Sequence, residues 1–228
     1  FTRDKIGAYS TTSAYANAAA RISVSARGTL SLGIAAGVVQ SVLDGTELGI
    51  PDDPSIPAGR DVFYRPDVKL GVYFNTPRFY AGLSASDLIQ YKDVFQIEPI
   101  RHYYFTTGYV FEVSNFVKLK PSILVKEDFN APANVDLNGF VLLGDRLWLG
   151  SSYRTSMNLF NKNEEADPVT KRTALALIAE LQVTNALRLG YSYDRMLNDL
   201  SGFQSHEISV GYYFFKKQDT KMLTPQYF

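Results

Sequence analysis

The sequence predicts an all-β fold, a transmembrane antiparallel up-and-down β-barrel, and three observations lead to this class. Apolar and polar residues alternate with a period of two through nearly the whole chain, which is the pattern of strands with one apolar face. Short turns alternate with long loops, as they do in outer-membrane barrels. Fifteen Tyr and fifteen Phe accompany a single Trp, and barrels in membranes place aromatic residues in girdles at both interfaces.

The composition argues against several other classes of protein. The chain has 228 residues, enough for one all-β domain. Its 23 Lys and Arg residues equal its 23 Asp and Glu residues, so it lacks the basic excess expected of a nucleic-acid binder. Cysteine is absent, which excludes disulfides and cysteine-ligated zinc. No apolar run reaches the length of about 18 residues that a helical membrane span needs.

The first five expected strands alternate between residues 12 and 113. Each places apolar side chains at every second position, with small, polar or charged side chains between them. In chain order, the strands and their apolar positions are 12–26 (Ala14 to Val24), 30–42 (Leu30 to Val38), 68–75 (Val68 to Phe74), 79–86 (Phe79 to Ala85) and 102–113 (Tyr103 to Val113).

Six further strands continue the pattern, so that about eleven are expected in this chain. In chain order they are 117–126 (Val117 to Val125), 134–141 (Val135 to Val141), 147–154 (Leu147 to Tyr153), 175–183 (Leu175 to Val183), 187–194 (Leu187 to Tyr193) and 207–214 (Ile208 to Phe214). Pro121 lies inside the first of these six. Because proline cannot donate a ladder hydrogen bond, we expect a bulge or a local break there.

The connections between these strands are sorted by length. Short turns are expected at residues 26–29, 75–78, 114–116, 143–146 and 183–186, and longer loops at 44–66, 87–101, 127–133, 155–171 and 195–205. In outer-membrane barrels the short turns are periplasmic and the long loops lie outside. Residues 1–11 are therefore expected on the outer side, and the last strand is expected to run toward the periplasm.

Strand parity leads to a prediction about the ends of the chain. Bacterial single-chain barrels have an even number of strands, so an odd count that begins outside implies an odd number of strands upstream. We expect residues 1–216 to form the outer-membrane barrel without its N-terminal strands. Residues 217–228 are expected to form a periplasmic C-terminal tail.

The polar faces of these strands carry charges of both signs. The expected network comprises Arg21, Lys118, Lys120, Lys126, Asp136, Arg154, Glu180, Arg188, Asp194 and Glu207, with Lys69 on a polar face as well. A charge that faces lipid near the midplane costs about 2–4 kcal/mol. We therefore expect these side chains to line the lumen, as ion pairs or as a surface that holds a plug or a partner segment. The alternative is a soluble β-sandwich whose wet face carries them.

No motif for catalysis, cofactor binding or metal ligation is found. His102 and His206 lack the nucleophile and carboxylate spacing of acyl-transfer sites, although an outer-membrane enzyme that uses them is one alternative. Asp136 to Gly139 resembles the start of a calcium loop without its bidentate Glu, and the segment is expected to be strand. The acidic segments 51–53 and 164–168 are expected to be solvated loops.

The C-terminal tail has two interpretations. It is either a disordered periplasmic end or a docking peptide for another envelope component. The second interpretation rests on Pro225, Tyr227 and Phe228, because an aromatic terminus is costly to leave in water.

Segments spread over the whole chain resemble the PorP/SprF family of Bacteroidetes outer-membrane proteins, which belong to the type IX secretion and gliding apparatus. The matching segments are Asp4 to Gly7, Leu119 to Ser122, Ala131 to Asn138, Leu147 to Arg154, Leu189 to Asp194, Ser205 to Ile208 and Pro225 to Phe228.

The resemblance implies a barrel of about fourteen strands, of which three are missing here, in the bacterial outer membrane. It also implies a non-enzymatic role in exporting or anchoring cell-surface proteins, such as adhesins with type B C-terminal domains. The implied partners are outer-membrane lipid, such a secreted protein, and other type IX secretion components, with no cofactor and no nucleic acid. A transport channel for small or apolar solutes is the alternative function.

Overall fold

The structure is a computed structural model that describes residues 1–48, 59–90, 100–159, 173–198, 202, 204–212 and 214. Its strands are β1 (Thr2–Ile6), β2 (Tyr9–Ser23), β3 (Thr29–Asp44), β4 (Arg60–Asn75), β5 (Phe79–Ser86), β6 (His102–Tyr109), β7 (Phe111–Glu112), β8 (Val117–Glu127), β9 (Ala133–Leu143), β10 (Leu147–Met157), β11 (Ala174–Gln182), β12 (Leu187–Met196) and β13 (Gln204–Tyr212). One short 3₁₀ helix, Gly45–Leu48, follows β3.

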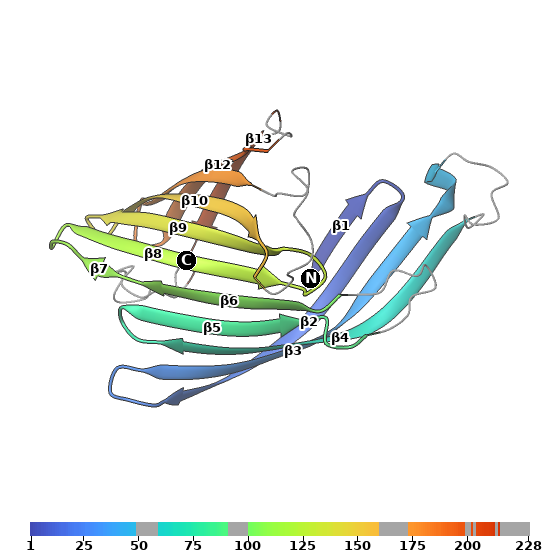
Figure 1. The fold of residues 1–228 in the computed structure, drawn as a ribbon, viewed down its shortest axis with the longest axis horizontal. Helices are drawn as coiled ribbons and strands as arrows, with labels where there is room; N and C mark the ends of the chain where they lie inside the picture. Colours follow the sequence, from blue (N-terminus) through green and yellow to red (C-terminus); the bar gives the residue numbers. More distant parts are fainter. Residues whose placement is uncertain are drawn as a thin grey trace. The chain divides into compact units, whose positions relative to one another are not determined.

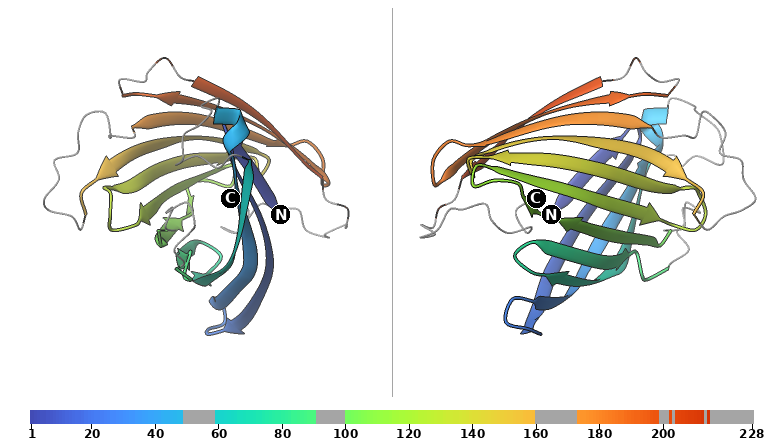
Figure 2. Two further views of the ribbon diagram at one scale, coloured as in Figure 1. Left: turned by 90° about the vertical axis from the view of Figure 1, so that its right-hand side faces the viewer. Right: turned by 60° about the vertical axis from the view of Figure 1, so that its left-hand side comes forward.

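All thirteen strands of the described residues belong to one sheet (Figure 1). Strands that follow each other in the chain are neighbours in it, except that β6 is followed in the sheet by β8, and β7 pairs with β8 off the main path. Neighbouring strands, such as β8 with β9 and β11 with β12, pair antiparallel. Figure 2 shows β8 to β13 side by side in chain order in both views. These features confirm the predicted all-β, antiparallel up-and-down class of transmembrane barrels. Within the described residues, no helix has the length and apolar character of a membrane span.

The chain begins with a strand that the alternation did not predict. β1 pairs with the start of β2, with Thr2 opposite Ser13 and Ile6 opposite Tyr9. Gly7 makes the tight turn between them at a φ of +57°, a conformation that glycine adopts at little cost. Of the thirteen strands, β7 lies off the main path, so the path holds twelve. With β1, the described path has one strand more than the eleven expected, and the expected absence of N-terminal strands stays a prediction.

The predicted loop at residues 44–66 was also too long. β4 starts at Arg60, eight residues before the expected start at Val68. The period of two does extend backward, because Tyr64 and Pro66 are exposed whereas Arg65 and Asp67 are half-buried or buried. Charged residues and Pro66 interrupt the apolar alternation between residues 60 and 67, so the sequence pattern did not predict this half of the strand.

The bulge or break expected at Pro121 does not interrupt its own strand, because β8 runs unbroken from Val117 to Glu127, and only the neighbouring strand on one side is interrupted. The ladder between β8 and β9 passes through Pro121 opposite Gly139. On the other side the expected single strand is divided into β6 and β7, and the Val110 amide donates instead to the Arg78 carbonyl at 2.7 Å. The register is the same before and after the break, with Gly108 opposite Ser122 and Phe111 opposite Leu119. No residue is inserted, so Pro121 does not produce a bulge.

The expected sorting of the connections holds for four of the five expected long ones. The strands leave short turns at residues 24–28, 76–78, 113–116, 144–146 and 183–186, and longer connections at 45–59, 87–101, 158–173 and 197–203. The connection at 128–132 is no longer than the turn at 24–28, and residues 7–8 form a further short turn between β1 and β2. Three of the short turns are closed by the same kind of side-chain hydrogen bond. The hydroxyls of Thr76, Ser114 and Thr184 each accept a hydrogen bond from the amide three residues later, at 2.9, 3.0 and 3.0 Å. Such a bond fixes a tight turn.

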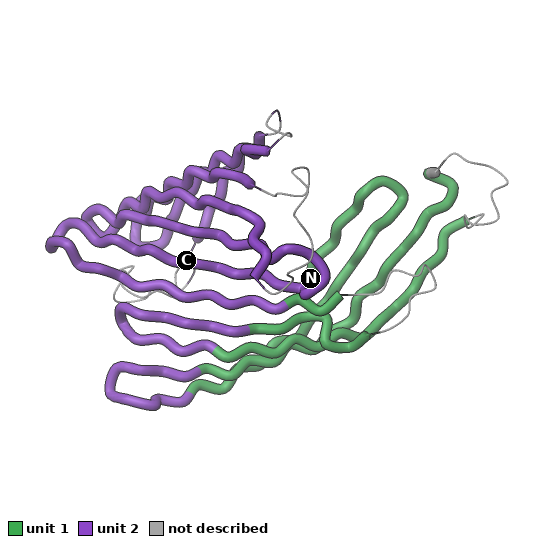
Figure 3. Tube along the Cα trace, viewed as in Figure 1, with its two compact units in different colours: residues 1–21, 31–72, 84–102 green, residues 22–30, 73–83, 103–228 purple. Residues whose placement is uncertain are grey.

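The described chain divides into two compact units, each built from pieces of several strands (Figure 3). Unit 1 comprises residues 1–21, 31–72 and 84–102. Unit 2 comprises residues 22–30, 73–83 and 103–228. Unit 2 contains a small buried apolar cluster in which Phe140 packs against Leu142 and Trp148. Each unit is described by itself below.

Candidate functional site

Burial in this sheet is inverted relative to a water-soluble protein. Lys120 and Asp67 are among the largest fully buried side chains, at 2% and 1% exposure. Large apolar side chains such as Leu177 and Leu137 are about half exposed, at 51% and 48%. Lys and Asp are almost never fully buried in ordinary domains unless they are paired. The sheet therefore has a buried polar face and an exposed apolar face, as the alternation predicted.

In unit 2, Asp136 holds two cations on the buried polar face. Lys126 Nζ lies 2.9 Å from Asp136 Oδ2, and Arg154 Nε donates to Asp136 Oδ1 at 3.0 Å. The three residues come from adjacent strands, because β9 pairs with β8 on one side and with β10 on the other. Both carboxylate oxygens are engaged, and this satisfies a side chain that is only 7% exposed. The triad carries a net positive charge.

Two further ion pairs lie on the same face of unit 2. Lys118 pairs with Asp145 in the turn that follows β9, and Arg188 Nη1 lies 3.3 Å from Glu180 Oε1 across the β11–β12 pair. Each pair joins neighbouring strands or a strand and the next turn. Six members of the predicted set therefore take part in ion pairs here, namely Lys118, Lys126, Asp136, Arg154, Glu180 and Arg188.

Lys120 is positioned between aromatic rings. Its Nζ lies 5.4 Å from the centroid of the Tyr80 ring and 6.0 Å from that of Phe140. A cation over a ring face is stabilised by the negative charge density of that face. Arg21 and Glu207 are exposed, and Asp194 is half-buried. The structure does not bring these three predicted residues into the ion pairs described above.

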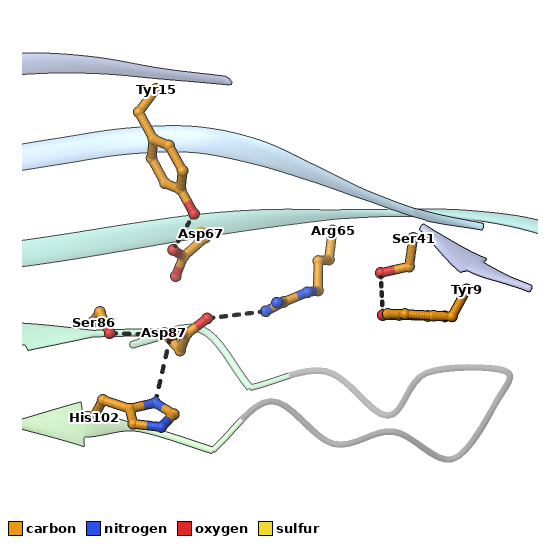
Figure 4. Close-up of polar contacts among 8 residues, drawn as sticks. All are labelled: Tyr9, Tyr15, Ser41, Arg65, Asp67, Ser86, Asp87 and His102. Carbon is orange, nitrogen blue, oxygen red and sulfur yellow. Dashed lines mark hydrogen bonds and ion pairs between the residues drawn. The ribbon is translucent and has the colours of Figure 1, made fainter. Parts of the chain in front are cut away.

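In unit 1, a second polar cluster joins residues of β2, β4, β5 and β6 (Figure 4). The Tyr15 hydroxyl donates to Asp67 Oδ2 at 2.7 Å. Asp87 accepts a hydrogen bond from Ser86 Oγ at 3.0 Å and one from Arg65 Nη1 at 3.4 Å.

His102 Nδ1 lies 3.9 Å from the same Asp87 carboxylate (Figure 4). The cluster thus has two carboxylates, one guanidinium, one imidazole and one phenol. Sequence reasoning missed the partners Tyr15, Arg65, Asp67 and Asp87. The signal that could have found Arg65 and Asp67 is their period of two with Lys69, which begins in the expected loop at residues 44–66.

Glycines make room for the rings that lie next to Lys69 and Lys120. A Cβ at Gly37 would lie 2.5 Å from Tyr15 Cδ1, and a Cβ at Gly108 would lie 2.6 Å from Tyr80 Cε1. Lys69 Nζ lies 4.0 Å from the centroid of the Tyr15 ring. Lys120 is placed in the same way over the Tyr80 ring, at the longer distance of 5.4 Å. In both cases the aromatic residue, the glycine and the lysine occupy three successive strands of the path, β2–β3–β4 and β5–β6–β8. Glycine is required because the ring lies against the neighbouring backbone.

The two histidines do not form a recognisable catalytic arrangement. His102 faces Asp87, whereas His206 Nδ1 shares a hydrogen bond with the Tyr191 hydroxyl at 2.8 Å and lies near the Tyr193 ring. Among the described residues no group of three His, Cys, Asp or Glu side chains could hold a metal ion. The Asp136 to Gly139 segment is strand, as expected.

Several sequence-based expectations lie outside the described residues. The tail residues Pro225, Tyr227 and Phe228 are among them, as are the acidic segments 51–53 and 164–168.

Comparison with known proteins identifies the family. The family model for the type IX secretion system membrane protein PorP/SprF matches residues 1–212. A search of curated proteins found no match. The match covers every described strand, from β1 to β13, and it agrees with a sheet that buries its charges and exposes its apolar side chains. The chain therefore belongs to the PorP/SprF family of type IX secretion system membrane proteins.

Proposed function

We propose that this protein is a non-enzymatic outer-membrane β-barrel of the type IX secretion and gliding apparatus. Its exposed apolar face contacts membrane lipid, and its buried polar face lines the lumen. In this role it helps to export or anchor cell-surface proteins, such as adhesins with type B C-terminal domains. The family match to a type IX secretion membrane protein supports the assignment to this apparatus.

The inverted burial is the observation that carries the membrane part of this proposal. Leaving one large apolar side chain in water forfeits about 1.5–3 kcal/mol of burial energy. Leu137, Leu149, Leu177 and Leu189 are all between 41% and 51% exposed on successive strands β9 to β12. Repeated exposure of such positions to water is unfavourable, whereas hydrocarbon removes the cost.

The buried polar face supports a role in holding a partner segment. The triad of Lys126, Asp136 and Arg154 leaves one positive charge without a counter-charge within the triad. A lumen lined in this way can hold an acidic or polar segment of a secreted protein through charge-assisted hydrogen bonds. We also propose the connections at residues 45–59 and 158–173, which the sequence pattern placed at 44–66 and 155–171, as partner surfaces. Residues 217–228, with Pro225, Tyr227 and Phe228, are proposed as a periplasmic docking peptide.

Deletion of the gene in the source bacterium tests the proposed role. Surface proteins with type B C-terminal domains should disappear from the cell surface and accumulate inside the envelope or be lost to the medium, and the wild-type gene should restore them. The measurement is mass spectrometry of peptides released by protease from intact cells. An unchanged set of surface proteins would contradict the proposed export or anchoring role.

The mixed-charge polar face also favours a second function, a transport channel. A polar lumen with ion pairs at its wall is the arrangement of water-filled barrels. Purified protein in planar bilayers distinguishes the two functions. Steady single-channel conductance without any bound secretion component would favour the channel, and a sealed lumen would exclude it.

A further inference from the structure

The exposed apolar face of β12 and β13 ends in a polar patch on the side of the long connections. We name this group the rim patch, and it consists of Tyr191, Tyr193, Arg195, Gln204 and His206. Tyr193 lies opposite His206, and Arg195 lies opposite Gln204, in the antiparallel register of the two strands. Arg195, Gln204 and His206 are exposed. All five residues belong to unit 2.

Hydrogen bonds fix the polar groups of the rim patch. The Tyr193 hydroxyl donates to Gln204 Oε1 at 2.8 Å, so the amide nitrogen is the group that can donate to a ligand. Tyr191 Oη lies 2.8 Å from His206 Nδ1, so Nε2 is the ring nitrogen that can contact a ligand. Together with the guanidinium of Arg195, these groups present several N–H donors on one exposed surface.

The rows next to the rim patch are apolar. Toward the short turns, Tyr191 lies opposite Ile208 and Leu189 lies opposite Val210. Ile208 and Val210 are 78% and 68% exposed. Tyr212, opposite Leu187, ends the apolar rows at the other side. The eight residue steps from Leu187 to Arg195 span about 27 Å along the strand at about 3.4 Å per residue. At a strand tilt of about 40° this is about 20 Å of height, so Arg195 lies near the edge of the apolar band of about 25 Å on membrane barrels.

Unit 1 carries a matching pair at the long-connection end of its exposed face. Gln40 Nε2 on β3 donates to the hydroxyl of Tyr64 on β4, and Tyr64 is 62% exposed. A Tyr–Gln pair thus ends the apolar face in each unit. The rim patch differs from this pair in two ways among the described residues. It also contains the hydrogen-bonded pair of Tyr191 and His206, and Arg195 lies directly opposite its glutamine, Gln204. The rim patch therefore combines a boundary position with a cation.

We propose that the rim patch binds the phosphate of a lipid headgroup in the leaflet that faces the long connections, with the lipid's acyl chains against Ile208, Val210 and Leu189. Arginine suits a phosphate because its planar fork donates two parallel hydrogen bonds. The apolar rows directly next to the cation favour a lipid over free phosphate. This inference rests on the proposed outer-membrane location, where the ligand is a phosphorylated glycolipid of the outer leaflet.

The test uses the full chain in nanodiscs of zwitterionic phospholipid. A phosphorylated glycolipid of the lipid A type is titrated in, and native mass spectrometry counts the bound copies. Arg195→Gln should weaken retention about tenfold, because a hydrogen bond to a charged group is lost. Arg195→Lys, which keeps the charge, should lose less. Arg146→Gln is the matched control, because Arg146 is exposed in the short turn at residues 144–146.

Each result decides the proposal. Equal retention by the wild type and Arg195→Gln would overturn it, as would equal retention of the dephosphorylated glycolipid. Competition by inorganic phosphate alone at millimolar concentration would indicate a free-anion site and would also overturn it. Membrane fractionation separates this inference from the proposed function. A wild-type chain that is absent from the outer membrane contradicts the proposed function, whereas a chain present there that retains no phosphorylated glycolipid contradicts only the lipid site.

Discussion

At the scale of single residues, the two buried carboxylates Asp136 and Asp67 accept hydrogen bonds or ion pairs from side chains on other strands. Asp136 accepts from one cation on each side, and Asp67 accepts from the Tyr15 phenol. A buried carboxylate that loses such a donor bears the cost of desolvation without compensation. The stability of these side chains therefore depends on single hydroxyl and guanidinium groups.

Tyr15→Phe isolates the contribution of one hydroxyl. The ring stays under Lys69, whereas the buried Asp67 loses the hydrogen bond at Oδ2. Because hydrogen bonds to charged groups contribute about 1.5–3 kcal/mol, we expect the free energy of unfolding to fall by about 2 kcal/mol. Urea titration of the protein in lipid vesicles, followed by tryptophan fluorescence, measures this change.

Tyr9→Phe is the matched control. Its hydroxyl donates to the neutral Ser41 Oγ at 3.1 Å, so the expected loss is about 1 kcal/mol or less. If Tyr9→Phe destabilises the protein as much as Tyr15→Phe does, Asp67 does not depend on the phenol.

At the scale of strands, much of the sheet could be predicted because alternation is a local property. The eleven expected strands are present, and the short turns lie within one or two residues of their expected places. β1 was missed because three of its five residues, Arg3, Asp4 and Lys5, are charged and show no apolar face. The pairing of β1 with β2 decides its structure, and pairing is not visible in a single segment.

The same limit applies to the polar site. The sequence predicted which charges share a face, but not which charges meet. Lys126 reaches Asp136 because the register of β8 and β9 places Lys126 opposite Asn134. Register depends on the turns and on both strands together. The tight packing of Tyr80 on Gly108 likewise depends on strands that are separate in sequence.

Gly108→Ala tests the packing between strands. The added Cβ would lie 2.6 Å from Tyr80 Cε1 and 2.8 Å from Ser122 Cβ, and overpacking of this kind costs about 1–3 kcal/mol. We expect a lower midpoint of thermal unfolding, measured by the heat-dependent shift of folded barrel on gels. Gly139→Ala is the control, because nothing lies within 4 Å of its Cβ position. Equal midpoints for the two variants would show that Tyr80 can move away.

At the scale of the whole molecule, the exposed apolar face decides which solvent the fold requires. Leu137 is 48% exposed near the middle of β9. If lipid covers this face, Leu137→Arg should lower the free energy of unfolding in vesicles by about 2–4 kcal/mol. Asn115→Arg, in the exposed short turn at residues 113–116, should change it by less than about 0.5 kcal/mol. Equal stability of both variants would mean that water covers the face around Leu137.

The inverted burial has a consequence for how the protein reaches its membrane. Its mean hydropathy is only −0.10, because apolar and polar positions alternate along the strands. The newly made chain is therefore not retained in a bilayer as an apolar helical segment would be. Before insertion, each strand exposes an apolar face and unpaired backbone groups to water, and it can aggregate with other strands. Transport to the membrane without aggregation therefore requires a chaperone that keeps the strands apart, and the chain must be released from this chaperone as it inserts into lipid.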